Sequence, residues 1–178
     1  DSIYAVDHPN VITNDPSSNI QNIPLWILAW LKEKFSKDLK IDKNLPRKFY
    51  IDRKDSISGT THLRKIINEN EVKEFFKKRN FEIINLSDLS FVEQVALFKN
   101  AKEIVGLHGA GFANVSFCEP QTNILELKPN SAGDMYKNLS INNKLNFKEI
   151  SIKPKSNKVL GQFGHIIIPI ESLKEKIN

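Results

Sequence analysis

The sequence predicts an α/β fold built on a doubly wound, mostly parallel sheet of the Rossmann-like kind, with helices on both faces. The first observation is an alternation of short apolar runs with helical patterns, which begins at Arg47. Such alternation is typical of βαβ units with right-handed crossovers. The second is a glycine turn, His108-Gly109-Ala110-Gly111, between an apolar run and a short helix. The third is that polar residues follow several apolar runs, at the edge where such sheets bind ligands.

Apolar patterns and helix signals locate the elements that follow Arg47. We expect strands over residues 49–51, 81–86, 103–107, 123–127 and 147–152. We expect helices over residues 68–78, from Ser90 onward, and over 110–117, 132–142 and 171–177, with a polar loop over 55–61. Asn68 with Glu71, and Ser90 with Glu93, have the spacing of a capping box, which satisfies N–H groups at a helix start. The apolar face of the helix after Ser90 is expected to comprise Phe91, Val95, Phe98 and Ala101.

The chain is expected to divide near residue 45. Residues 1–20 are rich in turn-forming residues and are interpreted as a linker. Residues 24–35 predict a helix with Pro24 in its first turn. Its apolar face comprises Trp26, Ile27, Trp30, Leu31 and Phe35. The tryptophan pair is expected to be core or a domain interface, with stacking on a sugar as the less favoured alternative. We therefore interpret residues 1–45 as a linker and interface helix at the edge of a missing N-terminal region, and 46–178 as one Rossmann-like ligand-binding domain.

The composition argues against several other classes of protein. Of the 178 residues, 40% are hydrophobic and 26% are charged, which is typical of a soluble globular protein. The single cysteine, Cys118, excludes an internal disulfide and is expected to be a small core residue. The longest apolar run, residues 23–31, is too short to span a bilayer. The net charge of +5 comes from scattered lysines without interleaved aromatic residues, so no nucleic-acid partner is expected.

The glycine turn is the most informative stretch of the chain. A helix that begins directly after a tight turn presents unpaired N–H groups and the positive end of its dipole, which suits a phosphate. On this interpretation Gly111 is a glycine so that an anion can approach the helix closely. The alternative is that the glycines only allow the strand and the helix to pack together.

Five stretches, in this order, carry a resemblance to a known family: Tyr50-Ile51-Asp52-Arg53-Lys54-Asp55, Arg64-Lys65-Ile66-Ile67-Asn68-Glu69, Phe91-Val92-Glu93-Gln94-Val95, residues 104–114 with the glycine turn, and Ile124-Leu125-Glu126-Leu127-Lys128-Pro129. Together they resemble the catalytic region of glycosyltransferase family 61, over residues 47–177. Two positions depart from the family's usual pattern. Asp52 stands where serine is usual, and Phe112-Ala113 stands where Leu-Thr is common.

The resemblance implies an inverting glycosyltransferase that moves a sugar from a nucleotide-sugar donor to a glycan or polysaccharide acceptor. The family includes bacterial capsular-polysaccharide transferases and eukaryotic O-linked sugar transferases, and it implies a two-domain GT-B architecture. This chain resembles the C-terminal, donor-binding half. An upstream acceptor-binding domain is expected, and in many two-domain transferases that half supplies the catalytic base. The abundance of Lys, Asn and Ile indicates an AT-rich, microbial genome, and a bacterial protein is expected. The expected location is the cytoplasm, with the inner face of the membrane as the more specific alternative.

The resemblance also points to residues that would bind the nucleotide and its diphosphate. Backbone N–H groups of Gly109, Ala110 and Gly111 would hold phosphate oxygens. Arg53 and Arg64 would supply fixed positive charge in fork geometry, the alternative being surface ion pairs. Asn114 is included in this set, and it is also expected to tie the short helix to a neighbouring loop.

Two titratable residues complete the candidate site. Glu126 is a carboxylate within an otherwise apolar strand, and a buried acid is costly unless it is paired. It would accept from ribose hydroxyls, or pair with a buried Arg or Lys. His108 is the candidate catalytic base, because its ordinary pKa is near working pH. A role in binding phosphate or orienting the glycine turn is favoured over catalysis.

No cofactor and no obligatory metal are expected. The acids of Asp52-Arg53-Lys54-Asp55 are three residues apart and flank two cations, so they do not form an Asp-x-Asp metal motif. The nucleotide sugar would be a substrate. The alternative to a transferase is a nucleotide-binding module without catalysis. A nucleic-acid-binding domain driven by the basic surface is a weaker third interpretation.

Overall fold

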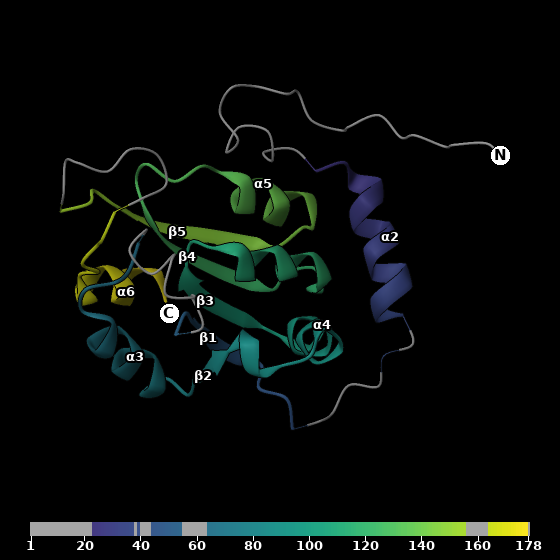
Figure 1. Ribbon diagram of the computed structural model, residues 1–178, viewed down its shortest axis with the longest axis horizontal. Helices are drawn as coiled ribbons and strands as arrows, with labels where there is room; N and C mark the ends of the chain where they lie inside the picture. The colour runs from purple at the N-terminus through teal and green to yellow at the C-terminus, as the bar shows by residue number, and fades with distance from the viewer. Residues whose placement is uncertain (1–22, 38, 40–43, 55–63, 156–163, 178) are drawn as a thin grey trace.

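The computed structural model describes residues 23–37, 39, 44–54, 64–155 and 164–177. Its centre is a sheet of five strands in the order β2-β1-β3-β4-β5, which confirms the predicted α/β fold (Figure 1). All four strand pairs are parallel. The strands are β1 (Lys48–Asp52), β2 (Glu82–Asn85), β3 (Glu103–Leu107), β4 (Asn123–Pro129) and β5 (Asn146–Ile152). The helices are α2 (Leu25–Ser36), α3 (Glu69–Lys77), α4 (Phe91–Asn100), α5 (Met135–Asn142) and α6 (Ile170–Lys176), with two 3-10 helices, η1 (Leu86–Asp88) and η2 (Ala110–Phe117).

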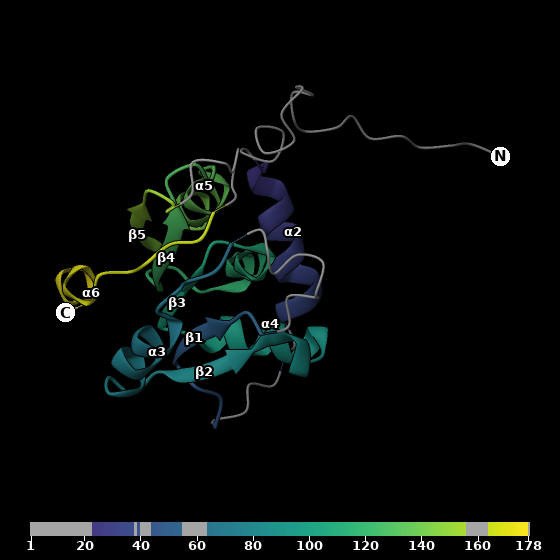
Figure 2. The same cartoon turned by 60° about the vertical axis from the view of Figure 1, so that its left-hand side comes forward.

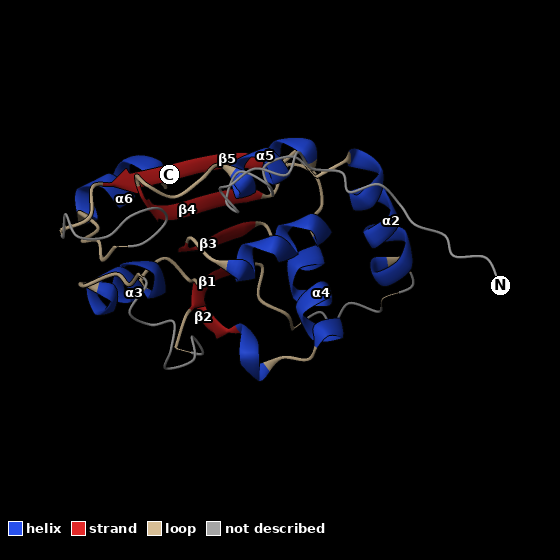
Figure 3. Cartoon of the chain, turned by 45° about the horizontal axis from the view of Figure 1, so that its top comes forward, coloured by secondary structure: helices blue, strands red, loops and turns tan. Residues whose placement is uncertain are grey.

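Helices cover both faces of the sheet, as predicted. One face packs against α3 and α6, and the other against α4, η2 and α5, with α2 outside α4 and η2 (Figure 2). The strand order reverses once, because β2 lies on one side of β1 and β3 on the other (Figure 3). Open α/β sheets bind ligands at such a switch point, beyond the carboxyl ends of the strands. Arg53 and His108 directly follow the two strands that meet there.

The central strands are buried on both faces, which is why they read as continuous apolar runs. Ile104 of β3 and Ile124 of β4 belong to the core on the α4 side, whereas Val105 and Leu125 belong to the core on the α3 side. This two-sided packing fixes the register of β3 on β4, because a slip of one residue would exchange the two faces. The edge where the ligand is expected is therefore held on a rigid support.

One of the two predicted capping boxes is confirmed and the other is wrong. At the start of α4, the N–H of Glu93 donates to Ser90 Oγ over 3.3 Å, and the N–H of Ser90 donates to Glu93 Oε2 over 2.7 Å. Asn68 precedes α3 but its side chain makes no such cap. Its Nδ2 donates to Glu71 Oε2 over 3.2 Å and to the Ile168 carbonyl over 2.9 Å, and its Oδ1 accepts from the Ile168 N–H over 3.0 Å. The side-chain oxygen that would cap α3 is therefore bonded to a distant segment of the chain.

That distant segment, residues 164–169, lies along residues 64–68 and is called the C-terminal strap below. Ile66 and Ile166 form a parallel β-bridge. The N–H of Ile67 donates to the Ile166 carbonyl over 2.8 Å, and the N–H of Ile166 donates to the Lys65 carbonyl over 3.0 Å. Both isoleucines of the bridge are buried. The strap therefore fixes the backbone next to Arg64.

The predicted helix at Pro24 is present as α2, but its tryptophans are not core. Trp26 is 61% exposed and Trp30 is 46% exposed, while Leu28 is the apolar residue that α2 buries. Phe91 of α4, expected on a buried face, is 49% exposed and meets Phe35 edge to face at 5.2 Å between ring centroids. The prediction that the two tryptophans belong to the core, and that Phe91 is buried, is therefore wrong. That the tryptophans form a domain interface stays a prediction.

Smaller differences concern helix type and helix ends. The predicted helix over 110–117 is a 3-10 helix, and Cys118, which directly follows it, is buried as expected. The helix predicted from residue 132 begins at Met135. The linker over 1–20 and the loop over 55–61 lie outside the described residues. None of the helices that the structure describes is long and apolar enough to cross a bilayer.

Candidate functional site

The carboxyl edge of the sheet gathers the predicted site residues around one backbone oxygen. Arg53 follows β1, and its Nη1 donates to the His108 carbonyl oxygen over 2.9 Å. Arg64 reaches the same oxygen from the segment held by the C-terminal strap, donating through Nε over 2.6 Å. Two guanidinium groups, from residues 11 positions apart in the sequence, therefore meet at one carbonyl oxygen at the start of the glycine turn. Such a pair matches the charge and fork geometry that a diphosphate requires.

Arg64 carries the clearest electrostatic sign of this pairing. Burial, together with the like charge of Arg53, lowers the pKa of Arg64 to about 10, while Tyr136 and Glu126 act in the opposite direction. Arg64 remains charged at neutral pH. The charged form of Arg64 is disfavoured in the folded protein, and an anion that binds beside it supplies an opposite charge that offsets the cost of burial and the repulsion by Arg53. A charged side chain whose pKa is shifted by burial and by a neighbouring like charge is typical of functional sites.

Gly109 makes room for Arg53. A Cβ placed on Gly109 would lie 2.9 Å from Arg53 Nη1 and 3.1 Å from Arg53 Cζ. The backbone of Gly109 is extended, with φ of 171°, so any residue could adopt its conformation. The reason for a glycine here is thus the close approach of the guanidinium group.

Gly111 has a different reason to be a glycine. A Cβ placed there would lie 2.9 Å from Leu86 Cδ1 and 3.4 Å from Ile51 Cγ2, both of which belong to the apolar core. The expectation that Gly111 leaves room for an anion is wrong, because the space beside it is filled by these side chains. Packing, the alternative interpretation, explains this glycine. Ala110, between the two, is exposed at the edge.

His108 and Glu126 form a buried pair beneath the arginines. His108 Nδ1 and Glu126 Oε1 are 2.5 Å apart, and the two residues are 1% and 0% exposed. Of the two alternatives for Glu126, the structure shows pairing inside the protein, with a histidine rather than the expected Arg or Lys. At 1% exposure, the imidazole of His108 is enclosed by protein. Its role as the catalytic base stays a prediction.

Tyr136 is a site residue that the sequence did not reveal. It lies in the first turn of α5, its ring centroid is 5.0 Å from that of His108, and Phe112 is its other ring neighbour. Burial and the charge of Glu126 raise the pKa of Tyr136 to about 12, while Arg64 and Arg53 act to lower it. Its hydroxyl is thus within electrostatic reach of both arginines. Its position soon after the end of β4 was the available signal.

Asn114 connects η2, the helix that contains part of the glycine turn, to α4. Its Nδ2 donates to Gln94 Oε1 over 2.9 Å, and Gln94 Nε2 donates in turn to the carbonyls of Leu86 and Leu89. These contacts tie η2 to α4 and to the loop after β2, as its second predicted role requires. Contact of Asn114 with a nucleotide stays a prediction.

A hollow of about 190 Å³ opens beside the two arginines. Its lining is mainly charged: Arg53, Lys54, Arg64, Lys65 and Glu69, with Ile66 and Leu107. Beneath it, Asp52 pairs with Lys73 over 2.8 Å, and this pair is largely buried. Lys73 also lies 3.6 Å from Glu69, so one lysine lies between the two acids at this edge. Of the residues that line the hollow, four are cations and one is an acid, so the lining carries net positive charge.

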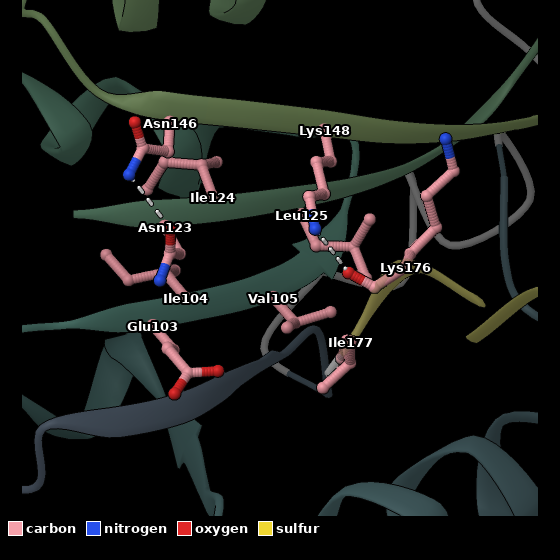
Figure 4. A pocket seen from close by; sticks show the side chains of 10 residues that line it. All are labelled: Glu103, Ile104, Val105, Asn123, Ile124, Leu125, Asn146, Lys148, Lys176 and Ile177. Atoms are coloured by element: carbon pink, nitrogen blue, oxygen red, sulfur yellow. Dashed lines mark hydrogen bonds between the residues drawn. The ribbon is translucent and has the colours of Figure 1, made fainter. Parts of the chain in front are cut away.

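A second hollow lies at the opposite, amino edge of the sheet. It is lined by residues of β3, β4, β5 and the end of α6, and measures about 150 Å³ (Figure 4). Lys148 Nζ donates to the Lys176 carbonyl, and Asn146 Nδ2 donates to Asn123 Oδ1. These polar groups satisfy one another, and Lys148, one of the two lysines that line this hollow, is engaged by a backbone carbonyl. The carboxyl edge is therefore the better candidate site.

No group of three His, Cys, Asp or Glu side chains among the described residues is placed to hold a metal ion. The charge that faces the hollow beside the arginines comes from side chains of the protein. Whether the site works without a metal stays a prediction.

Arg64→Met is expected to leave the melting temperature at pH 7 unchanged or raised, while weakening diphosphate binding by about tenfold or more. The folded pKa of Arg64, about 10, lies below its ordinary value, so the charged group lowers stability at every pH below about 10. That loss is relieved only as the pH rises through the folded pKa. Thermal melts and calorimetry on the same variant test this. A fall of several degrees with normal affinity would make Arg64 a stability residue.

Comparison with known proteins identifies the family to which the chain belongs. A family model described as Glycosyltransferase 61 matches residues 4–125, more than half of the chain. No curated protein matches the sequence. The match contains Arg53, Arg64 and the whole glycine turn, and it ends one residue before Glu126. The chain therefore belongs to the glycosyltransferase 61 family, a family of sugar-transferring enzymes.

Proposed function

We propose that this chain binds the nucleotide-sugar donor of a glycosyltransferase, with the diphosphate on Arg53 and Arg64 at the carboxyl edge of the sheet. The observation that carries the proposal is the pair of guanidinium groups fixed on one carbonyl oxygen, that of His108. Both flank a charged hollow at the switch point of the sheet. Membership of the glycosyltransferase 61 family supplies the sugar.

The arginines would act on the leaving group. Glycosyl transfer breaks the bond between the anomeric carbon and the diphosphate, and negative charge grows on the diphosphate as the bond lengthens. Two preorganised cations in a partly buried site stabilise that charge, and they hold the donor in place for attack by an acceptor hydroxyl. Because side chains supply this charge, we propose that no divalent metal is required.

The acceptor and the catalytic base are proposed to lie elsewhere in the protein. His108 is enclosed, so an acceptor hydroxyl does not reach its ring in this arrangement. A second, upstream domain would bind the glycan or polysaccharide acceptor and supply the base, giving a GT-B enzyme that inverts the anomeric centre. This chain would be the donor-binding half.

A thermal-shift screen of nucleoside diphosphates and nucleotide sugars, with the matching nucleosides as controls, tests the proposal. A ligand at a hundred times its dissociation constant is expected to stabilise the fold by about 2.7 kcal/mol. For a domain of this size that corresponds to a rise of roughly 5–10 °C in melting temperature. Nucleosides are expected to give much smaller shifts. If no diphosphate at millimolar concentration changes the melting temperature, the proposal is wrong.

The second candidate is a nucleotide-binding module without catalysis, and the enclosure of His108 is the observation in its favour. Binding alone does not separate the two. Sugar transfer by the full-length protein, followed as release of nucleoside diphosphate in the presence of acceptor, does. Release that disappears in Arg53→Ala supports the enzyme, whereas binding without any release supports the module.

A further inference from the structure

Glu126 lies at the end of a chain of contacts that reaches the arginines without Glu126 touching them. Its Oε1 is 2.5 Å from His108 Nδ1, and the carbonyl of the same histidine accepts from Arg53 and Arg64. Its other oxygen, Oε2, is buried and has no hydrogen-bond partner among the described residues. A buried carboxylate with one unpaired oxygen is costly to keep. Fold stability alone is thus a poor explanation for it.

Strand β4 holds His108 at two points. The N–H of His108 donates to the Leu127 carbonyl over 2.8 Å, and its ring bonds to Glu126 on the same strand. The ring of Tyr136 packs against the imidazole at 5.0 Å. These contacts hold the chain before the His108 carbonyl, and the N–H of Phe112, which donates to the Gly109 carbonyl over 2.9 Å, holds the chain after it. The direction of the His108 carbonyl in turn sets where both guanidinium groups point.

We propose that Glu126 is a positioning residue: through His108 it orients the carbonyl that holds Arg53 and Arg64 together to receive a diphosphate. The proposal rests on the diphosphate role of the arginines given above. It assigns Glu126 a part in binding the anion without contact with it. A binding site is more precise when its contacting groups are held by a supporting layer of this kind.

The charge of Glu126 and its contact with His108 are expected to have opposite effects on the affinity for a diphosphate. A negative charge near two arginines opposes the binding of an anion, so removing the charge alone strengthens diphosphate binding. Removing the acceptor for His108 Nδ1–H frees the ring and weakens that binding. Glu126→Gln removes the charge and keeps an acceptor oxygen, whereas Glu126→Met removes both at similar size.

The experiment measures pyrophosphate affinity by calorimetry for the wild type, E126Q and E126M. Pyrophosphate carries the anion without a base or a sugar. E126Q is expected to bind as tightly as the wild type or more tightly, and E126M about tenfold or more weakly than E126Q. Leu125→Ala, a buried change on the same strand that faces away from His108, controls for lost stability and is expected to keep its affinity. Equal affinities for E126Q and E126M overturn the proposal.

A second pair of variants covers the case in which E126M does not fold. His108→Asn keeps an N–H close to the position of Nδ1, and His108→Leu does not. The asparagine variant is expected to bind pyrophosphate about tenfold or more tightly than the leucine variant, and equal affinities overturn the proposal. If the wild type binds pyrophosphate but no nucleoside diphosphate, only the proposed function fails. If it binds neither, both fail.

Discussion

Arg53→Ala is expected to weaken the binding of a nucleoside diphosphate by about ten- to a hundredfold and to leave the binding of the bare nucleoside nearly unchanged. The guanidinium of Arg53 is held by the His108 carbonyl rather than by an acidic side chain among the described contacts, so its charge is not neutralised there. A charged hydrogen bond to a phosphate contributes about 1.5–3 kcal/mol, which corresponds to this loss.

Calorimetry with both ligands checks this expectation, and Lys65→Ala is the matched control. Lys65 is an exposed cation that lines the same hollow, without a fixed position against the His108 carbonyl. Its removal is expected to change diphosphate affinity only about two- to threefold, as for an exposed charge. If Arg53→Ala weakens nucleoside and nucleoside diphosphate equally, Arg53 acts in folding or at another site.

Gly109→Ala is expected to reduce diphosphate affinity almost as far as Arg53→Ala does, with little change in melting temperature. The added methyl group would lie 2.9 Å from Arg53 Nη1, so the guanidinium must move away from the His108 carbonyl. The extended backbone of Gly109 accepts alanine without strain. In a protein that already carries Arg53→Ala, the glycine change is expected to have almost no further effect, because both act on one group.

Gly111→Ala provides the control for a methyl group in the same turn. Here the methyl group meets Leu86 in the core. Overpacking is expected to lower the free energy of unfolding by about 1–3 kcal/mol, and so the melting temperature, while the affinity stays normal. Melting temperature and affinity measured on both variants separate site from packing. A Gly111→Ala protein that is stable but binds weakly would place the anion at η2 instead of the arginines.

The sequence predicted the positions of the site residues better than their contacts. Arg53, His108 and Glu126 follow or lie within strongly apolar runs, so the parallel sheet brings them to one edge whatever the details. The roles of the two glycines needed distances. Both flank Ala110, yet one faces a guanidinium group and the other faces a leucine, and no local pattern distinguishes them.

Long-range contacts account for most of what was missed. The amide of Asn68 bonds to the nearby acid Glu71, but the oxygen that would cap the helix accepts from the N–H of Ile168. Tyr136 joins the site because α5 lies across His108, a fact of packing rather than of spacing. The apolar face of α2 was clear from periodicity, but periodicity does not say how much of that face the domain covers, and Trp26 remains exposed.

The C-terminal strap has a consequence for the order in which the protein is built. Asn68 and Ile168 are 100 residues apart, so the backbone next to Arg64 takes its final position only after residue 168 has been synthesised. Contacts of such high sequence separation form late in folding. In a nascent chain that ends before the strap, Arg64 is therefore not yet held beside Arg53. Such a chain is not expected to bind a nucleotide through the arginine pair. Diphosphate binding would then report that synthesis has passed the strap.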